Sequence, residues 1–313
     1  MSRPPRVSVI TIFLNAERFI TEALDSVLRQ TYKDWELLLV DDGSDDEGTN
    51  IARDYARRYP GRIRYLEHHN HRNRGMSASR NLGIREARGQ YVAFLDADDV
   101  YLSDKLTRQV AILDRETEAA MVYGATQHWY SWTGEPEDQT RDTSRQLGVQ
   151  PDTLIRPPSL IPLFLQRRAQ TPGTCGVLVR REALDQVGAF NEEFRGMYED
   201  QVFFFKLCLA FPVFIASGTS DRYRQHPNSH ARRMRRAGAW NAKGKPSPTH
   251  RTFVTWLRDY VIEQDVMDRE VWKALNAELW PYRHPTLYRV SSLVRNPSPL
   301  LGRQVFQLLR RSQ

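Results

Sequence analysis

Strand-like and helix-like segments alternate through the N-terminal part of the chain. The first, Val7–Phe13, is a near-continuous apolar run, which is typical of a strand buried on both faces of a parallel sheet. Further buried strands are expected at Trp35–Val40, Ile63–Leu66 and Tyr91–Leu95, each separated from the next by residues with helical spacing. This order predicts βαβ units, and therefore a parallel sheet with right-handed crossovers.

The expected helices and the later strands follow from the same periodicities. Helices are predicted over Glu47–Tyr59, from Gly75 to about Gly89, and over Leu102–Leu113 with Ser103 as the N-cap. Residues 125–157 show no clear period and are expected to form a loop or an insertion, either over an active site or as a surface excursion.

Regular structure is expected to resume after that insertion. Strands are predicted at Thr174–Arg180, at Pro212–Ala216 and at Asp221–Arg224, and an apolar helix over Val202–Leu209 begins with Glu199 and Asp200. An aspartate near a helix start is also a favoured N-cap, so a purely structural role for Asp200 stays open at this point.

Two acidic clusters lie where predicted strands end. Asp41 and Asp42 follow the second strand, and Asp96, Asp98 and Asp99 follow the fourth. Crowded carboxylates repel one another unless a cation or hydrogen-bond donors compensate them, and Mg²⁺ or Mn²⁺ held to a diphosphate is the compensation we favour. Helix capping is the alternative for each cluster alone. It explains poorly why both would fall at the carboxyl edge of one sheet, where ligands bind in such folds.

Charge and cysteine content narrow the class of partner. The net charge of +7 favours anionic partners such as nucleotide phosphates, acidic lipids or nucleic acid. Nucleic-acid binding would rest only on the basic run 232–245 and is not expected. Cys175 and Cys208 have neither metal-ligand nor redox spacing, so buried thiols are expected.

The two ends of the chain bear on where the protein acts. The N-terminus leads into the first strand without a signal-peptide core, which predicts a cytoplasmic protein. Pro299–Arg311 has the pattern of an amphipathic helix with basic residues. It would either lie on an anionic membrane, placing the protein at the inner face, or pack against the main domain or a second subunit, which we favour.

Taken in order, these motifs resemble those of a family 2 glycosyltransferase with a GT-A fold. The resemblance covers residues 6 to 230. It is carried by Val7-Ser8-Val9-Ile10 with Asn15, Val40-Asp41-Asp42-Gly43-Ser44, Ala78-Ser79-Arg80-Asn81-Leu82-Gly83, Phe94-Leu95-Asp96-Ala97-Asp98-Asp99, Glu199-Asp200 and Tyr223-Arg224-Gln225-His226-Pro227. It implies an α/β catalytic domain over 1–230, with a Rossmann-like, mostly parallel sheet flanked by helices. A basic, mainly helical extension over 231–313 would follow.

The resemblance also implies roles at the donor side of a site. Asp42, with Asp41 beside it, would accept hydrogen bonds from the base of a nucleotide, and Asp96 would face the ribose or the donor sugar. Arg80 would add positive charge near the diphosphate. The first strand departs from the family pattern, because it ends Thr11-Ile12-Phe13-Leu14-Asn15 without the usual Pro- or Thr-containing turn. At Ile12 and Phe13 only the backbone would line the base pocket.

The remaining implied roles concern the metal and the acceptor. Asp98 would bind the divalent cation, Mn²⁺ or Mg²⁺, and His226 would complete that metal site. Asp200 would be the general base that deprotonates the acceptor, and Glu199 would orient the acceptor. Burial would raise the pKa of Asp200, whereas the helix N-terminus would lower it.

The implied reaction is inverting, metal-dependent transfer of a sugar from a nucleoside-diphosphate sugar to an acceptor hydroxyl. A glycan or lipid-linked acceptor in cell-envelope polysaccharide or glycoconjugate synthesis is expected. A nucleotidyltransferase would want a Gly- and Arg-rich loop with a Lys after the first strand, and a dinucleotide-binding oxidoreductase would want Gly-x-Gly-x-x-Gly there; both are absent. A silent sugar- or nucleotide-binding scaffold on the same fold is the other alternative, and it has no need of the clustered carboxylates.

Overall fold

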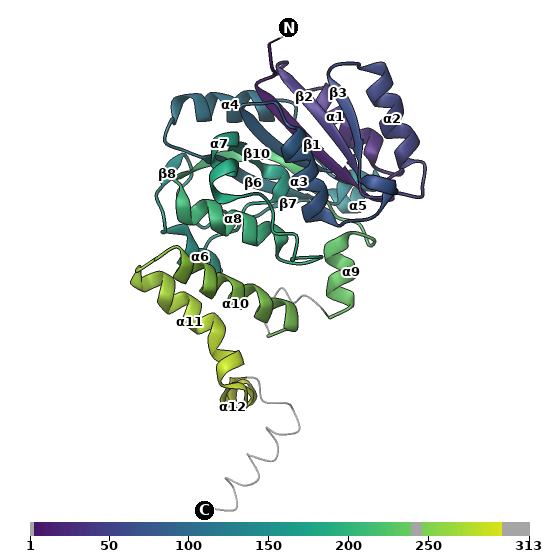
Figure 1. Cartoon of the computed structure of the whole chain (residues 1–313). Coiled ribbons are helices and arrows are strands. Elements are labelled where there is room, and N and C mark those ends of the chain that lie inside the picture. The colour runs from purple at the N-terminus through teal and green to yellow at the C-terminus, as the bar shows by residue number, and fades with distance from the viewer. Residues whose placement is uncertain (1–2, 239–245, 296–313) are drawn as a thin grey trace, which may run out of the picture. The chain divides into compact units, whose positions relative to one another are not determined.

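The computed structural model describes residues 3–238 and 246–295 (Figure 1). The chain forms two compact units, Met1–Trp240 and Asn241–Gln313. The predicted helix Pro299–Arg311 lies outside the described residues, and so do residues 239–245 of the basic run.

The first unit is built on one sheet with the strand order β3-β2-β1-β4-β9-β6-β10-β5. The strands are β1 (Val7–Phe13), β2 (Trp35–Asp41), β3 (Ile63–Glu67), β4 (Tyr91–Asp96), β5 (Val100–Tyr101), β6 (Met121–Trp129), β9 (Val177–Arg180) and β10 (Val213–Arg224). Two short strands, β7 (Thr143–Ser144) and β8 (Thr153–Ile155), pair with β6 and β10. The pairs among β1 to β4 are parallel, as predicted, and so is β6 with β10; β9 is antiparallel to both of its neighbours.

Helices connect these strands in the order that the apolar spacing predicts. They are α1 (Ile20–Leu28), α2 (Gly48–Arg58), α3 (Met76–Glu86), α4 (Lys105–Arg115), α5 (Pro136–Gln139), α6 (Leu160–Leu165), α7 (Arg181–Val187), α8 (Glu199–Ala210) and α9 (His230–Arg236). Leu24 and Val27 of α1 are fully buried in one core cluster with Val9 of β1 and Leu37 of β2. Burial of such side chains is the main source of stability in a domain of this size.

Four local predictions need correction. Helix α4 begins at Lys105, and the residue before it is Asp104 rather than Ser103; neither caps it, because no side-chain cap hydrogen bond forms there. Strand β6 continues to Trp129, so the irregular segment begins after that residue rather than at 125. Thr174–Gly176 is a 3-10 turn ahead of β9 rather than part of the strand.

The fourth correction concerns β10, which is one strand and not two. Its pairing with β6 shifts in register between Ile215 and Thr219 and again between Thr219 and Asp221. Gly218 lies in this irregular stretch with φ of +77°, which few residues other than glycine adopt easily. The local period is lost there, and this is why the sequence reads as two strands.

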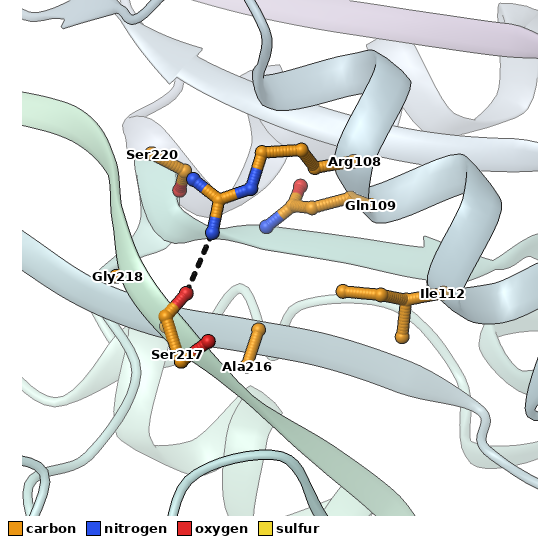
Figure 2. A pocket seen from close by; sticks show the side chains of 8 residues that line it. Arg108, Gln109, Ile112, Ala216, Ser217, Gly218 and Ser220 are labelled. Atoms are coloured by element: carbon orange, nitrogen blue, oxygen red, sulfur yellow. Dashed lines mark hydrogen bonds between the residues drawn. The ribbon is translucent and has the colours of Figure 1, made fainter.

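The irregularity in β10 leaves a small pocket against α4 (Figure 2). Arg108 reaches across it and donates a hydrogen bond of 2.7 Å to the Ser217 carbonyl oxygen. The volume of about 10 Å³ accommodates a single water at most. No residue predicted for the functional site lines this pocket.

The second unit contains α10 (Pro248–Glu263), α11 (Arg269–Arg283) and α12 (Pro285–Arg295). Ser247 and Asp268 cap α10 and α11 by accepting hydrogen bonds from the backbone N–H groups of His250 and Val271. All three helices lie in the extension over 231–313, which the resemblance implied to be mainly helical. Among the described helices, none has both the length and the apolar character needed to cross a bilayer.

Candidate active site

The carboxyl ends of β1, β2 and β4 meet at one edge of the sheet. Phe13 of β1 pairs with Asp41 of β2, and Ile12 pairs with Asp96 of β4. The Asp42 N–H donates to the Phe13 carbonyl oxygen at 2.9 Å. The two acidic clusters therefore lie side by side, as the strand order predicts. The side chains of Ile12 and Phe13 are both buried in the structure.

The carboxylates of the first cluster shape the loops around them. Asp41 accepts hydrogen bonds from the Ser44 N–H at 2.8 Å and from the Thr49 hydroxyl at 2.5 Å. Asp42 accepts from the backbone N–H groups of Arg74 at 2.7 Å and Gly75 at 3.0 Å. These bonds compensate both buried charges and hold the segment before α3 against the end of β2. Contact of either carboxylate with a nucleotide base stays a prediction.

The loop leaves no space for a side chain at Gly43. Its φ is +85°, and a Cβ would lie 2.8 Å from the backbone of both Asn73 and His71. We expect Gly43→Ala to lower the free energy of unfolding by about 1–3 kcal/mol, from backbone strain and displaced loops. Chemical denaturation measures this change.

Gly61→Ala is the matched control for Gly43→Ala. Its φ of +78° is similar, but a Cβ there meets nothing within 4 Å, so only the strain remains. Gly43→Ala is expected to lower the free energy of unfolding more than Gly61→Ala does. Equal effects of the two variants on stability would contradict the close packing of the loop.

Arg80 links the second acidic cluster to α8. Its guanidinium is only 3% exposed and donates to Asp96 Oδ1 at 2.8 Å, while Nη1 lies 3.9 Å from Glu199 Oε1. Nε and Nη1 of Arg80 have no hydrogen-bond partner among the described residues. Arg80 therefore joins Asp96 at the end of β4 to Glu199 at the start of α8, and two of its nitrogen atoms keep hydrogen-bond donors unused. Its predicted place near a diphosphate stays a prediction.

Helix α3 also holds the segment that leads into α8. The Asn81 amide donates to the Phe190 carbonyl oxygen and accepts from the Phe190 N–H, both at 2.9 Å. The Ser77 hydroxyl donates to the Phe194 carbonyl oxygen at 3.2 Å. The motif Ala78–Gly83 and its neighbours thus place the start of α8 as well as Arg80.

Asp200 lies in the first turn of α8 and is not its N-cap. The N-cap position is Tyr198, whose φ is +69°, and no side chain caps the helix. Asp200 Oδ1 accepts a hydrogen bond of 2.7 Å from the Gln201 N–H. Burial and then the charge of Glu199 raise the pKa of Asp200 to about 7, and they outweigh the backbone hydrogen bond and Arg80, which lower it. Burial likewise raises the pKa of Glu199.

Asp98 and His226 come together from distant parts of the chain. Asp98 Oδ2 lies 3.0 Å from His226 Nε2, in the loop that follows β10. Asp99 is buried and has both oxygens occupied, one by the Arg224 N–H at 2.8 Å and one by the Cys175 thiol at 3.1 Å. Burial and the neighbouring carboxylates raise the pKa of Asp99 well above its usual range. Its contacts are those of a structural carboxylate.

Two sets of side chains in this region offer metal ligands. Ligand atoms of Asp96, Asp99 and Cys175 lie within 4.8 Å of one another. That set includes a thiol, and both oxygens of Asp99 already accept hydrogen bonds. Mg²⁺ and Mn²⁺ prefer carboxylate oxygens as ligands, and softer ions also accept imidazole. Asp98 is partly exposed and meets an imidazole. The donor set of Asp98 and His226 therefore fits a hard divalent cation better.

The site contains residues that the sequence reading did not single out for a role. Cys175 accepts from the Asp96 N–H at 3.2 Å, besides donating to Asp99. Arg224 donates from Nε to the Asp98 carbonyl oxygen and from its backbone N–H to Asp99 Oδ1. Arg224 stands two residues before His226 in a recognised motif, which was a usable signal; nothing in the sequence around Cys175 indicates its position.

Solved structures share this architecture. TarS of S. aureus, in complex with UDP-GlcNAc, aligns over 95% of this chain and 77% of its own, with a TM-score of 0.65 and 20% identity. The mannosyltransferase PcManGT of Pyrobaculum calidifontis, in complex with GDP-Man and Mn²⁺, aligns over 99% and 81%, with a TM-score of 0.56 and 18% identity. These likenesses, with the sheet described above, define the fold as that of the GT-A glycosyltransferases.

Sequence relatives narrow the class to a family. The model of glycosyl transferase family 2 matches residues 8–188, more than half of the 313 residues, and the chain belongs to this family. EpsE of Bacillus subtilis, named as a glycosyltransferase, is 39% identical over 39% of this chain and 43% of its own length. GgaB of the same species, a minor teichoic acid biosynthesis protein, is 40% identical over 30% of this chain and 10% of its own. The chain thus spans less than half the length of these relatives.

Proposed function

We propose that this protein transfers a sugar from a nucleoside-diphosphate sugar to an acceptor hydroxyl, with inversion at the anomeric carbon and with a bound divalent cation. The observation that carries the proposal is the chain of contacts from the helix turn that holds Asp200, the proposed general base, to Asp96 of the second acidic cluster at the end of β4. Glu199, beside Asp200, lies 3.9 Å from Arg80, and Arg80 lies 2.8 Å from Asp96. A proton acceptor with a pKa of about 7 is thereby held next to the predicted donor loop.

The chemistry follows from the residues present. Asp200 takes the proton of the acceptor hydroxyl, and the freed oxygen forms a bond to the anomeric carbon. The bond from that carbon to the diphosphate oxygen breaks, and its electron pair leaves with the nucleoside diphosphate. Asp98 and His226 would hold the cation, which when bound neutralises charge on the departing diphosphate. Attack from the face opposite the leaving group inverts the configuration.

The names of the relatives support the substrate classes. TarS was solved with UDP-GlcNAc and PcManGT with GDP-Man and Mn²⁺, so a uridine or guanosine diphosphate sugar is the first donor to test. The name of GgaB points to cell-envelope polymer synthesis, with a glycan or lipid-linked acceptor. We further propose action in the cytoplasm, with the net charge of +7 favouring contact with the inner face of an anionic membrane.

A thermal-shift panel tests the donor class. We expect one nucleotide sugar, from a set of UDP- and GDP-sugars, to raise the unfolding midpoint by about 5 °C at a hundredfold excess over its Kd. The rise should be larger with Mn²⁺ than with EDTA, because the cation adds to diphosphate binding. If no nucleotide sugar stabilises the protein in either condition, while Mn²⁺ alone leaves it folded, the proposed function fails.

A further inference from the structure

Arg224, at the end of β10, is almost completely enclosed. Its side chain is 2% exposed and its guanidinium carbon lies over three aromatic rings. The distances to the ring centroids are 4.8 Å for Phe19, 4.4 Å for Trp129 and 5.2 Å for Trp132. Rings around a cation attract it and exclude water, which strengthens the polar contacts that the cation makes.

The polar contacts of Arg224 all point to the acidic loop and to α1. Nε donates to the Asp98 carbonyl oxygen at 2.7 Å, and the backbone N–H donates to Asp99 Oδ1 at 2.8 Å. Nη2 donates to Glu22 of α1 at 2.6 Å. One planar guanidinium thus ties the loop after β4 to a helix on the other side of it. A lysine has the charge but not the fork that reaches two partners at once.

The same cage supports His226. Its ring packs on Phe19 with a centroid distance of 4.7 Å, and Trp132 donates from its indole nitrogen to the Gln225 carbonyl oxygen at 3.0 Å. Trp129 and Trp132 come from the end of β6 and the turn after it, where the irregular segment begins. The end of β6 and the start of that segment therefore contribute one aromatic ring each to the support of the predicted metal ligands.

We propose that Arg224 is a positioning residue, whose guanidinium in its aromatic cage holds Asp98 and His226 at the separation from which they can share a divalent cation. The inference rests on the proposed function for the identity of that cation. It assigns the first part of the irregular segment a role in shaping the metal half of the site. Residues that orient metal ligands without touching the metal commonly change metal affinity by about 10–100-fold when replaced.

Arg224→Lys tests the inference, with Arg108→Lys as the matched control. Arg108 also donates to carbonyl oxygens of β10, at Ser217 (Figure 2) and at Thr219, and its ion-pair partner is Asp104, outside the acidic loop and the cage. Free Mn²⁺ is measured by electron paramagnetic resonance with UDP or GDP present. We expect Arg224→Lys to weaken Mn²⁺ binding by about tenfold or more, and Arg108→Lys to leave it unchanged. Glu22→Gln, at a half-exposed position, should weaken it by about threefold.

A second measurement does not depend on any metal. Diethyl pyrocarbonate modifies accessible histidines, and His226 is buried against Phe19 and Asp98. Peptide mass spectrometry should show His226 modified several-fold faster in Arg224→Lys than in the wild type or in Arg108→Lys. An unchanged rate in folded Arg224→Lys protein overturns the inference. Wild-type protein that binds no Mn²⁺ with either nucleotide would remove the cation from the proposed function, and the modification rate would then decide the role of Arg224.

Discussion

Asp200→Asn is expected to slow sugar transfer by about 10²–10⁴-fold while leaving donor binding intact. Asparagine keeps the shape of the side chain, and its Oδ1 can still accept from the Gln201 N–H, so the start of α8 should be unchanged. It cannot take the acceptor proton. General-base catalysis contributes about 10²–10⁴-fold to a rate, and a loss in this range is expected in kcat. Turnover with saturating donor and acceptor measures it.

The control for Asp200→Asn is the same substitution at an exposed position. Asp185 lies on the surface of α7, and Asp185→Asn should leave both turnover and binding as in the wild type. Calorimetry with the donor should give the same Kd for all three proteins. Unchanged turnover in Asp200→Asn would mean that Asp200 is not the general base. A higher Kd for the donor would place Asp200 in the donor-binding site instead.

The rate should also depend on pH through Asp200. Since burial and Glu199 raise the pKa of Asp200 to about 7, the carboxylate is the form that accepts a proton above that pH. Below it the rate should fall by about tenfold per pH unit. The charge of Glu199 raises the pKa, so Glu199→Gln should move the acid limb to lower pH. If the acid limb of the pH–rate profile lies at the same pH in Glu199→Gln, a group other than Asp200 titrates there.

Much of the fold can be predicted from local patterns because buried parallel strands leave a plain signal. Val7–Phe13 is apolar at nearly every position and forms β1 over those same residues. The acidic residues at the ends of β2 and β4 follow from the strand order, since parallel neighbours end at one edge. The proximity of the two acidic clusters can therefore be predicted from the sequence alone.

What could not be predicted depends on contacts between distant residues. The neighbouring Glu199 contributes to the rise in the pKa of Asp200 to about 7, but the largest cause is burial, whose extent only the folded chain shows. Trp129 and Trp132 sit in a stretch without periodicity, and only their packing on Arg224 gives them meaning. The sequence predicts two strands where β10 is continuous, because the middle of β10 has no strand period. Pairing with β6 nevertheless keeps this stretch in the sheet.

Asp98→Ala is expected to weaken nucleoside-diphosphate binding strongly in Mn²⁺ and hardly at all in EDTA. Asp98 is partly exposed, and its Oδ2 meets His226 Nε2 at 3.0 Å, so its loss removes a carboxylate ligand without opening the core. The expected rise in Kd for UDP or GDP with Mn²⁺ is about tenfold or more. Asp104→Ala, at an exposed aspartate just before α4, is the control and should change neither Kd. If the Kd of Asp98→Ala in Mn²⁺ stays at the wild-type value, Asp98 is not a ligand of the cation.

Cys175→Ser then separates the two candidate ligand sets. Serine can still donate to Asp99 and accept from the Asp96 N–H, so the buried carboxylate keeps its partner. If Asp98 and His226 hold the cation, Cys175→Ser should bind Mn²⁺ as the wild type does while Asp98→Ala does not. If the cation sits with Asp96, Asp99 and Cys175, the ranking reverses, and a thiophilic ion such as Cd²⁺ should lose the most affinity in Cys175→Ser. We expect the first ranking, because a hard cation can reach the partly exposed Asp98, whereas both oxygens of the buried Asp99 already accept hydrogen bonds.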